Sequence, residues 1–237
     1  MPVIVTEAKH AGPVKASSEA ATLMSRPEEA AKRGFGAGFE TAPDDQSAVA
    51  ARAKRMHDRW KPKAIISIER PGPAKDGVVY NATAIPKGPE TGIIDIAEVF
   101  HEANRRGVFS IGIGDHGNEM GFGRIPEAVA RIMPKGDRLC TVVKADVLSP
   151  CLMSNWGAYA IEAAPAFLLK KPGLMPTWKT EERIIRTCLD AVGLEAMWCS
   201  ADFIADSADG KSSMAVAQLL NNLVRLALQA PTRGVAH

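Results

Sequence analysis

The sequence predicts an α/β fold, a mainly parallel sheet flanked by helices in three layers, formed by a single domain over residues 1–237. Short apolar or β-branched segments alternate with longer helical segments along the chain, as in proteins with parallel sheets. Two of the short segments, ending at Ile68 and Ile111, continue into polar loops that carry acidic side chains. Ligands of open α/β sheets bind beyond such strand ends, so a ligand site is expected there.

The predicted strands are short runs rich in valine, isoleucine and threonine. They are residues 2–6, 64–68, 108–111 and 140–143. The run 64–68 is almost continuously apolar, which predicts a strand buried on both faces of the sheet.

The predicted helices follow from apolar residues that recur with a period near 3.6 and from start and stop signals. They are residues 17–33, 45–60, 94–106, 126–133, 181–192 and 212–228, with a further helix beginning at 154. Ser154 and Asn155 are expected to cap the helix that begins at 154. Gly107 is expected to end the helix 94–106. The helix 212–228 is so apolar that it should pack into the core or against a partner, including a second copy in a homo-oligomer.

Composition excludes several kinds of protein. The 237 residues carry 29 basic and 27 acidic side chains, a net charge of +2, and only 5% are aromatic, which does not favour a nucleic-acid or membrane surface. The four cysteines lack the spacing of a zinc site, and we expect reduced thiols. No signal peptide or membrane-spanning run is recognisable, so we expect a cytoplasmic protein or one of an organelle matrix, acting on a small molecule.

The segment 110-SIGIGDHGNEMGFGRIP-126 contains the spacing G-x-G-x-x-G at Gly112, Gly114 and Gly117. A dinucleotide-binding loop needs its helix to begin within the motif, so that backbone N–H groups face the pyrophosphate. Here the next predicted helix begins only at Pro126, and two acids in the loop would repel a phosphate. We therefore expect no nucleotide cofactor.

Two other interpretations of this loop stay open at this point. Its glycines could serve tight turns, with the polar side chains in solvent. Alternatively, Asp115, Asn118 and Glu119 could supply oxygen ligands to Mg²⁺ or Mn²⁺. The spacing alone does not separate the two.

Four motifs in order carry a resemblance to a known family. They are 64-AIISIERPGPAKDGVVYN-81, 111-IGIGDHGNEMGFG-123, 154-SNWGAYA-160 after Asp146-Val-Leu, and Asp209-Gly210 before the last helix. In these stretches the chain resembles the D-glutamate cyclase family, in its C-terminal cyclase-like domain.

The resemblance implies a lyase that cyclises D-glutamate, a small amino acid, to 5-oxo-D-proline with loss of water. The amine attacks the side-chain carboxyl carbon, and a divalent cation, Mg²⁺ or Mn²⁺, could polarise that carboxyl group. The expected metal ligands are Glu69, Asp76, Asp115 and Glu119, and the expected catalytic residues are Glu69, Asp115, His116 and Glu119.

Substrate contacts are expected from a further set of polar residues: Arg70, Asn81, Asn118, Ser154 and Asn155. The planar guanidinium of Arg70 suits a substrate carboxylate. Structural roles remain as alternatives, since Arg70 could pair with an acid of the protein and Ser154-Asn155 could only cap a helix.

Two departures from the family pattern bear on activity. The family motif has glycine at the position of His116, whose side chain could narrow the pocket, act as an acid or base, or bind a metal. Related chains are also expected to carry an additional strand and a glycine-rich segment before Val3–Thr6. We therefore keep two alternatives, a metal-dependent hydrolase or phosphatase for a small acidic substrate and a non-catalytic remnant that binds a small ligand or a partner.

Overall fold

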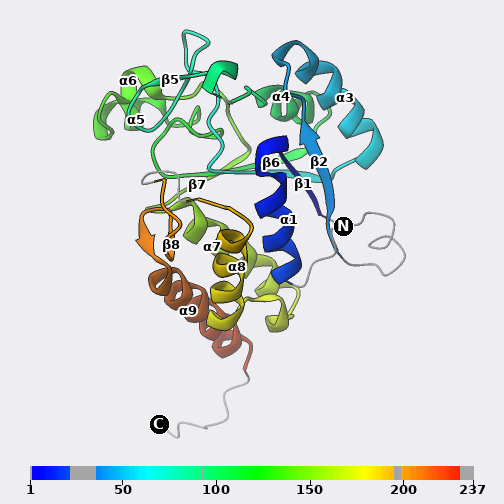
Figure 1. Ribbon diagram of the computed structural model, residues 1–237, viewed down its shortest axis with the longest axis vertical. Coiled ribbons are helices and arrows are strands. Elements are labelled where there is room, and N and C mark those ends of the chain that lie inside the picture. Colours follow the sequence, from blue (N-terminus) through cyan, green and yellow to red (C-terminus); the bar gives the residue numbers. More distant parts are fainter. Residues whose placement is uncertain (1, 22–35, 92, 195–198, 230–237) are drawn as a thin grey trace, which may run out of the picture.

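The computed structural model describes residues 2–21, 36–91, 93–194 and 199–229 (Figure 1). Its longer strands run parallel. The strands are β1 (Val3–Glu7), β2 (Gly38–Ala42), β3 (Ala64–Ile68), β4 (Val79–Tyr80), β5 (Pro86–Lys87), β6 (Phe109–Gly114), β7 (Val147–Pro150), β8 (Ile204–Ala205) and β9 (Ala208–Asp209). β3, β6 and β7 form one parallel sheet in that order, and β1 and β2 form a second parallel pair. Two short antiparallel pairs, β4–β5 and β8–β9, lie in the connections.

Helices account for most of the remaining described chain. They are α1 (Ala11–Ala20), α3 (Val49–Trp60), α4 (Ala97–Arg105), α5 (Pro126–Ile132), α6 (Gly136–Leu139), α7 (Ser154–Leu168), α8 (Trp178–Asp190) and α9 (Gly210–Leu228). Short 3₁₀ turns cover Ala8–His10, Gln46–Ala48, Pro89–Thr91 and Pro172–Leu174. None of the helices within these described ranges is both long and apolar enough to cross a membrane.

The three-stranded sheet lies between two groups of helices. On one face, Ile65 of β3 joins a core formed with α3 and α4, which contains Val49, Ala53 and Phe100. On the other face, Ile113 of β6 lies against Gly157 of α7, and α8 and α9 pack beyond α7 (Figure 1). The predicted α/β fold with a parallel sheet flanked by helices is thereby confirmed.

Sequence signals placed several elements correctly. The predicted helix 45–60 is present as α3, and Val49, Ala53 and Met56, which recur at helical spacing, are buried. Gly107 follows α4 with a φ of 66°, the left-handed conformation of a glycine that ends a helix. In α9, Ala217 and Val224 are buried while Leu219 and other leucines stay exposed, so the apolar helix packs through one face only.

Other predictions were wrong. Residues 140–143 do not form a strand: Thr141 makes an isolated bridge with Ala74, and the third strand of the sheet is β7. β3 is an edge strand, and Ile66 and Ile68 are 47% and 50% exposed, so it is not buried on both faces. α1 begins at Ala11, ahead of the predicted start at residue 17, and most of the predicted helix 17–33 lies outside the described residues.

Candidate functional site

Two acidic residues stand at the carboxyl ends of neighbouring strands. Glu69 follows β3 directly, and Asp115 follows β6 directly. The strands run parallel with Ile68 opposite Ile113, so both ends reach the same edge of the sheet. The backbone N–H of Glu69 donates to Ile113 O at 3.0 Å, and its φ of 51° is a left-handed conformation that an ordinary residue adopts only at an energetic cost.

The loop after β6 folds back across the strand that precedes it. A Cβ atom at Gly112 would overlap the carbonyl oxygen of Met120, so only glycine allows this close approach. The returning loop is fixed by hydrogen bonds from Met120 N to Arg70 O at 2.9 Å and from Gly121 N to Val143 O at 2.9 Å. The glycines therefore bring residues 115–119 over the strand ends.

Glu119 points into its own loop. Its side chain is 3% exposed, and its carboxylate accepts hydrogen bonds from Gly117 N at 2.8 Å and from His116 N at 3.2 Å. Backbone N–H groups of the G-x-G-x-x-G segment, which would face a pyrophosphate in a dinucleotide site, therefore bind a carboxylate of the protein itself.

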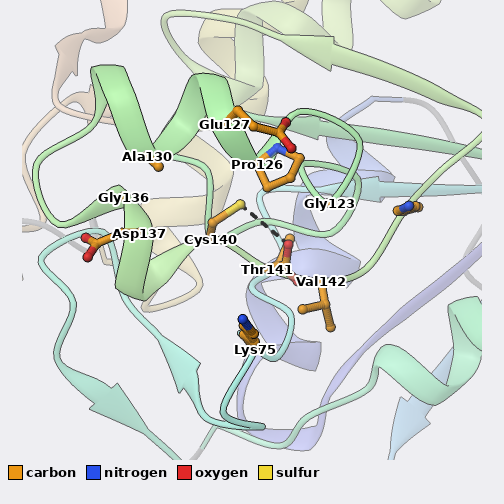
Figure 2. A pocket seen from close by; sticks show the side chains of 11 residues that line it. Lys75, Gly123, Pro126, Glu127, Ala130, Gly136, Asp137, Cys140, Thr141 and Val142 are labelled. Carbon is orange, nitrogen blue, oxygen red and sulfur yellow. Dashed lines mark hydrogen bonds between the residues drawn. The ribbon is translucent and has the colours of Figure 1, made fainter.

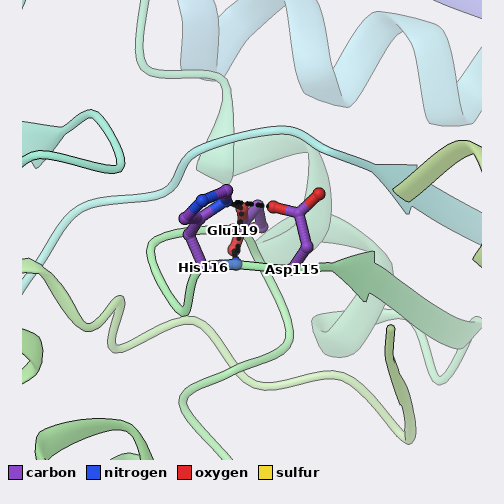
Figure 3. A group of neighbouring side chains, drawn as sticks. All are labelled: Asp115, His116 and Glu119. Carbon is purple, nitrogen blue, oxygen red and sulfur yellow. Dashed lines mark hydrogen bonds and ion pairs between the residues drawn. The ribbon is translucent and has the colours of Figure 1, made fainter. Parts of the chain in front are cut away.

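Side chains that can ligate a metal form two overlapping groups. Asp115, His116 and Glu119 make one group (Figure 3), and Asp115 is shared with Glu69 and Asp206 in the other. Within each group the potential ligand atoms lie within 4.8 Å of one another. Of the four expected metal ligands, Asp115 belongs to both groups, Glu119 to one and Glu69 to the other.

The pKa values in this cluster reflect its crowded negative charge. Desolvation and the charges of Asp206, Asp115 and Glu119 raise the pKa of Glu69 to about 8. Because the residue as a whole is exposed, we attribute the raised pKa of Glu69 mainly to repulsion by those carboxylates. Desolvation and the charge of Asp115 likewise raise the pKa of Glu119 to about 7 and that of Asp206 to about 6. Such a group is stabilised by a proton, a cationic substrate group or a metal ion.

His116 supplies positive charge to the cluster when protonated, and its nearest carboxylate is that of Asp115. The Nδ1 of His116 contacts Asp115 Oδ1. Burial opposes ionisation of Asp115, but the hydrogen bond and charge of His116 outweigh it and lower the pKa of Asp115. The same hydrogen bond raises the pKa of His116.

Asp206 is a site residue that the sequence analysis missed. It lies in the two-residue turn between β8 and β9, where Asp206 and Ser207 have φ values of 54° and 63°. Two consecutive left-handed residues fit the turn of a tight hairpin. The only sequence signal is an Asp-Ser pair between two short segments, more than 80 residues from Asp115, which does not indicate the contact.

Ser154 contacts the cluster through both its backbone and its side chain. Its N–H donates to Asp115 Oδ2 at 3.1 Å and to Asp206 Oδ2 at 3.0 Å, and its Oγ donates to Asp115 Oδ2 at 3.1 Å. The predicted helix cap at Ser154-Asn155 was wrong, since Met153 occupies the N-cap position and the carboxylates of Asp115 and Asp206 bind the free N–H. Asn155 is half-buried and makes no side-chain hydrogen bond within the described residues.

Arg70 faces the protein. Its terminal nitrogens bind the carboxylate of Glu7 and the carbonyl oxygen of Ile94, and the Glu7–Arg70 pair is largely buried. This is the structural alternative considered for Arg70, with the acid supplied by the end of β1. A substrate carboxylate would have to compete with these partners.

The remaining expected residues differ in their surroundings. The Oδ1 of Asn81 accepts from Thr83 N and Ile85 N, which closes a turn. The exposed carboxylate of Asp76 accepts from Tyr80 Oη at 2.6 Å and Val78 N at 3.0 Å, and Asp76 belongs to neither ligand group. These turn contacts hold Asp76 away from the cluster, so its expected role as a metal ligand has no support in the geometry.

Asn118 combines a bonded and an unbonded polar atom. Its Nδ2 donates to Tyr80 O at 2.9 Å, whereas its buried Oδ1 has no hydrogen-bond partner among the described residues. An unpaired buried acceptor is unfavourable unless a ligand or ion satisfies it. An amide oxygen is, like the carboxylates and imidazole of the same loop, a ligand type that divalent cations accept.

A cavity of about 490 Å³ lies outside this cluster (Figure 2). Its walls include Lys75, Glu127, Asp137, Cys140 and Lys144. No residue of the two ligand groups lines it. The charged lining is mixed, with two lysines and two acids, so it does not define a ligand.

A known family matches most of this chain, including the residues of the site. A sequence family described as D-glutamate cyclase-like, C-terminal, matches residues 1–224. The human protein named D-glutamate cyclase, mitochondrial, is 40% identical over 101 residues, which is 42% of this chain and 16% of the human protein. The matched part is therefore a small fraction of that relative's length.

Proposed function

Because this chain belongs to the D-glutamate cyclase-like family, we propose that it catalyses the metal-assisted cyclisation of D-glutamate to 5-oxo-D-proline. The observation that carries the proposal is the convergence of Glu69, Asp115 and Glu119 at one edge of the sheet, inside the region that matches the family. The enzyme would be a lyase that releases water.

The reaction requires a proton acceptor and a stabilised oxyanion. The ammonium group loses a proton, and its nitrogen attacks the side-chain carboxyl carbon to form a C–N bond. A C–O bond then breaks, and the departing oxygen leaves as water with the two protons that the nitrogen gives up. Charges and atoms balance, since one ammonium and one carboxylate become one amide and one water.

The charge of the cluster fits one end of the substrate better than the other. Glu69 and Asp206 offer carboxylates to the substrate ammonium group, and either could take its proton. The two substrate carboxylates, however, would be repelled by the same acids, and Arg70 is already bound to Glu7. The proposal therefore includes a cation.

The two ligand groups both contain Asp115, and this residue would hold the cation with members of either group. Bound there, a divalent ion would polarise the reacting carboxyl group and stabilise the oxyanion. Ser154 supports the position of Asp115 by donating two hydrogen bonds to it, so Ser154 acts as a positioning residue.

The test is product formation under defined metal conditions. Protein stripped of metal is incubated with D-glutamate, alone or with Mn²⁺ or Mg²⁺, and 5-oxoproline is separated and quantified. We expect product with D-glutamate and a cation, and much less without the cation. L-glutamate serves as the control for stereochemistry.

A matched pair of variants assigns the activity to the cluster. Asp115→Asn should lose activity, whereas Asp58→Asn, which alters a surface ion pair with Arg106, should retain it. A folded wild-type protein that makes no 5-oxoproline with any of these metals would rule out the proposed reaction.

A further inference from the structure

His116 gives one of the two ligand groups a different chemistry from the other. Glu69, Asp115 and Asp206 offer oxygen atoms only, whereas Asp115, His116 and Glu119 add an imidazole nitrogen. In Figure 3 the imidazole ring lies beside the carboxylates of Asp115 and Glu119. The two groups therefore differ in the cation that they suit.

The geometry of the nitrogen-containing group is compatible with one shared ion. The Nδ1 of His116 contacts Asp115 Oδ1 and lies 3.9 Å from Glu119 Oε1. Both carboxylate side chains are only 3% exposed, while that of His116 is 39% exposed and closes the group on its solvent side. An ion entering from solvent would meet the imidazole first.

A second observation comes from the same loop. The buried Oδ1 of Asn118, two residues from His116, has no hydrogen-bond partner within the described residues. An amide oxygen is a neutral ligand for a cation or an acceptor for water bound to one. The loop thus contains a buried oxygen acceptor that no described group of the protein satisfies.

Ligand type distinguishes cations that have the same charge. Mg²⁺ is bound mainly through oxygen atoms and keeps several waters, whereas imidazole nitrogen favours first-row transition metals. Within that series the affinity of a nitrogen and oxygen site rises from Mn²⁺ to Co²⁺.

We propose that His116, together with Asp115 and Glu119, binds the cation of this site and makes it selective for a transition-metal ion such as Co²⁺ or Mn²⁺ over Mg²⁺. The inference rests on the proposed function for the role of the cation in the reaction, but its test measures binding and does not depend on turnover. Glu69 and Asp206 remain free for the substrate ammonium group.

The experiment measures ion binding to the full chain after removal of metal. Mn²⁺ binding is followed by electron paramagnetic resonance, Co²⁺ binding by its visible absorption, and Mg²⁺ binding by competition with Mn²⁺. His116→Ala should weaken Co²⁺ binding about 100-fold, at the upper end of the loss caused by removing groups that support metal ligands. Mg²⁺ binding should change by less than about threefold, since Mg²⁺ gains little from imidazole.

His101→Ala is the matched control, because His101 lies on α4 and belongs to neither ligand group. It should bind all three ions like the wild type. Thermal unfolding of both variants establishes that they are folded, and the Co²⁺-to-Mg²⁺ preference of the wild type tests the proposal without any variant.

Several results would overturn the inference. They are equal affinity of the wild type for Co²⁺ and Mg²⁺, Co²⁺ binding that His116→Ala leaves intact, or loss of binding only when Glu69 and Asp206 are both replaced. If Co²⁺ binds through His116 but no 5-oxoproline forms, the proposed reaction is rejected and the inference on His116 stands. If 5-oxoproline forms but His116→Ala leaves metal binding unchanged, the inference on His116 is rejected and the proposed reaction stands.

Discussion

The loops after β3 and β6 begin at the same edge of the sheet and both carry acidic residues, yet they place them differently. The β6 loop brings Asp115, His116 and Glu119 together within five positions of the strand end. In the β3 loop only Glu69, the first residue, reaches the cluster. Arg70 binds Glu7, and Asp76 and Asn81 close turns. Proximity to the strand end, more than acidity, decides which side chains join the site.

Glycine explains why the β6 loop reaches further than the β3 loop. Gly112 and Gly121 let the backbone of the β6 loop cross its own strand, and Gly121 has a φ of 119° that few other residues adopt. The β3 loop instead pairs with the β6 loop through Gly72 N and Asn118 O at 2.9 Å and then closes on itself through β4 and β5. The β6 loop crosses its own strand, whereas the β3 loop turns back through a short hairpin.

The largest effect is expected from Gly112→Ala, compared with Gly77→Ala in the β3 loop. The added methyl group at Gly112 would overlap Met120 O, and such overpacking against backbone costs on the order of 3 kcal/mol. Gly77 has a φ of 80° with open space around its Cβ position, so its replacement costs only the left-handed conformation, about 1–2 kcal/mol. Urea unfolding compares the two variants. Equal losses of stability in the two variants would mean that the close crossing of the β6 loop over its strand does not contribute specially to the stability of the fold.

Glu69→Gln should separate activity from stability. Activity should fall about 100-fold if Glu69 takes the substrate proton, whereas removal of a repelled carboxylate should raise the melting temperature. Because the pKa of Glu69 is about 8 in the fold against an ordinary 4.5, its contribution to stability is present below pH 4.5 and lost as the pH rises through 8.

The stability of Glu69→Gln should therefore exceed that of the wild type most above pH 8. Thermal unfolding of metal-free protein across that pH range measures the difference. Glu90→Gln, at an exposed position in the segment after β5, is the control. A pH dependence that matches the wild type would show that Glu69 does not belong to the charged cluster.

The smallest effect is expected from Asp76→Asn. Its carboxylate serves a turn through Tyr80 and Val78, so the variant should lower the melting temperature slightly and leave activity and Mn²⁺ affinity within about twofold of the wild type. Kinetics with D-glutamate and Mn²⁺ titration check this. A loss of metal affinity comparable to that of Asp115→Asn would restore Asp76 as a ligand.

Local signals in the sequence were sufficient for much of the fold. Periodic apolar residues located α3 and α4, and Gly107 located the end of α4. These local signals do not give the position of a strand within the sheet, because the exposure of a strand depends on packing against residues distant in sequence. For that reason the apolar run of β3 predicts burial on both faces, although the strand lies at an edge of the sheet.

The candidate site shows the same limit. Asp115 and Glu119 were predictable because they share one short loop, and Glu69 because it follows a strand of the same sheet. Asp206 depends on how the β8–β9 turn packs against the start of α7, a contact between segments distant in sequence. The role of Arg70 depended on Glu7, which the sequence does not link to it.

The most direct test of the account is anomalous diffraction from crystals grown with Mn²⁺ and D-glutamate. We predict one strong manganese peak within coordinating distance of Asp115, His116 and Glu119, with the substrate ammonium group next to Glu69. A manganese ion bound only elsewhere, or D-glutamate bound away from the ends of β3 and β6, would contradict the claim that these strand ends form the active site.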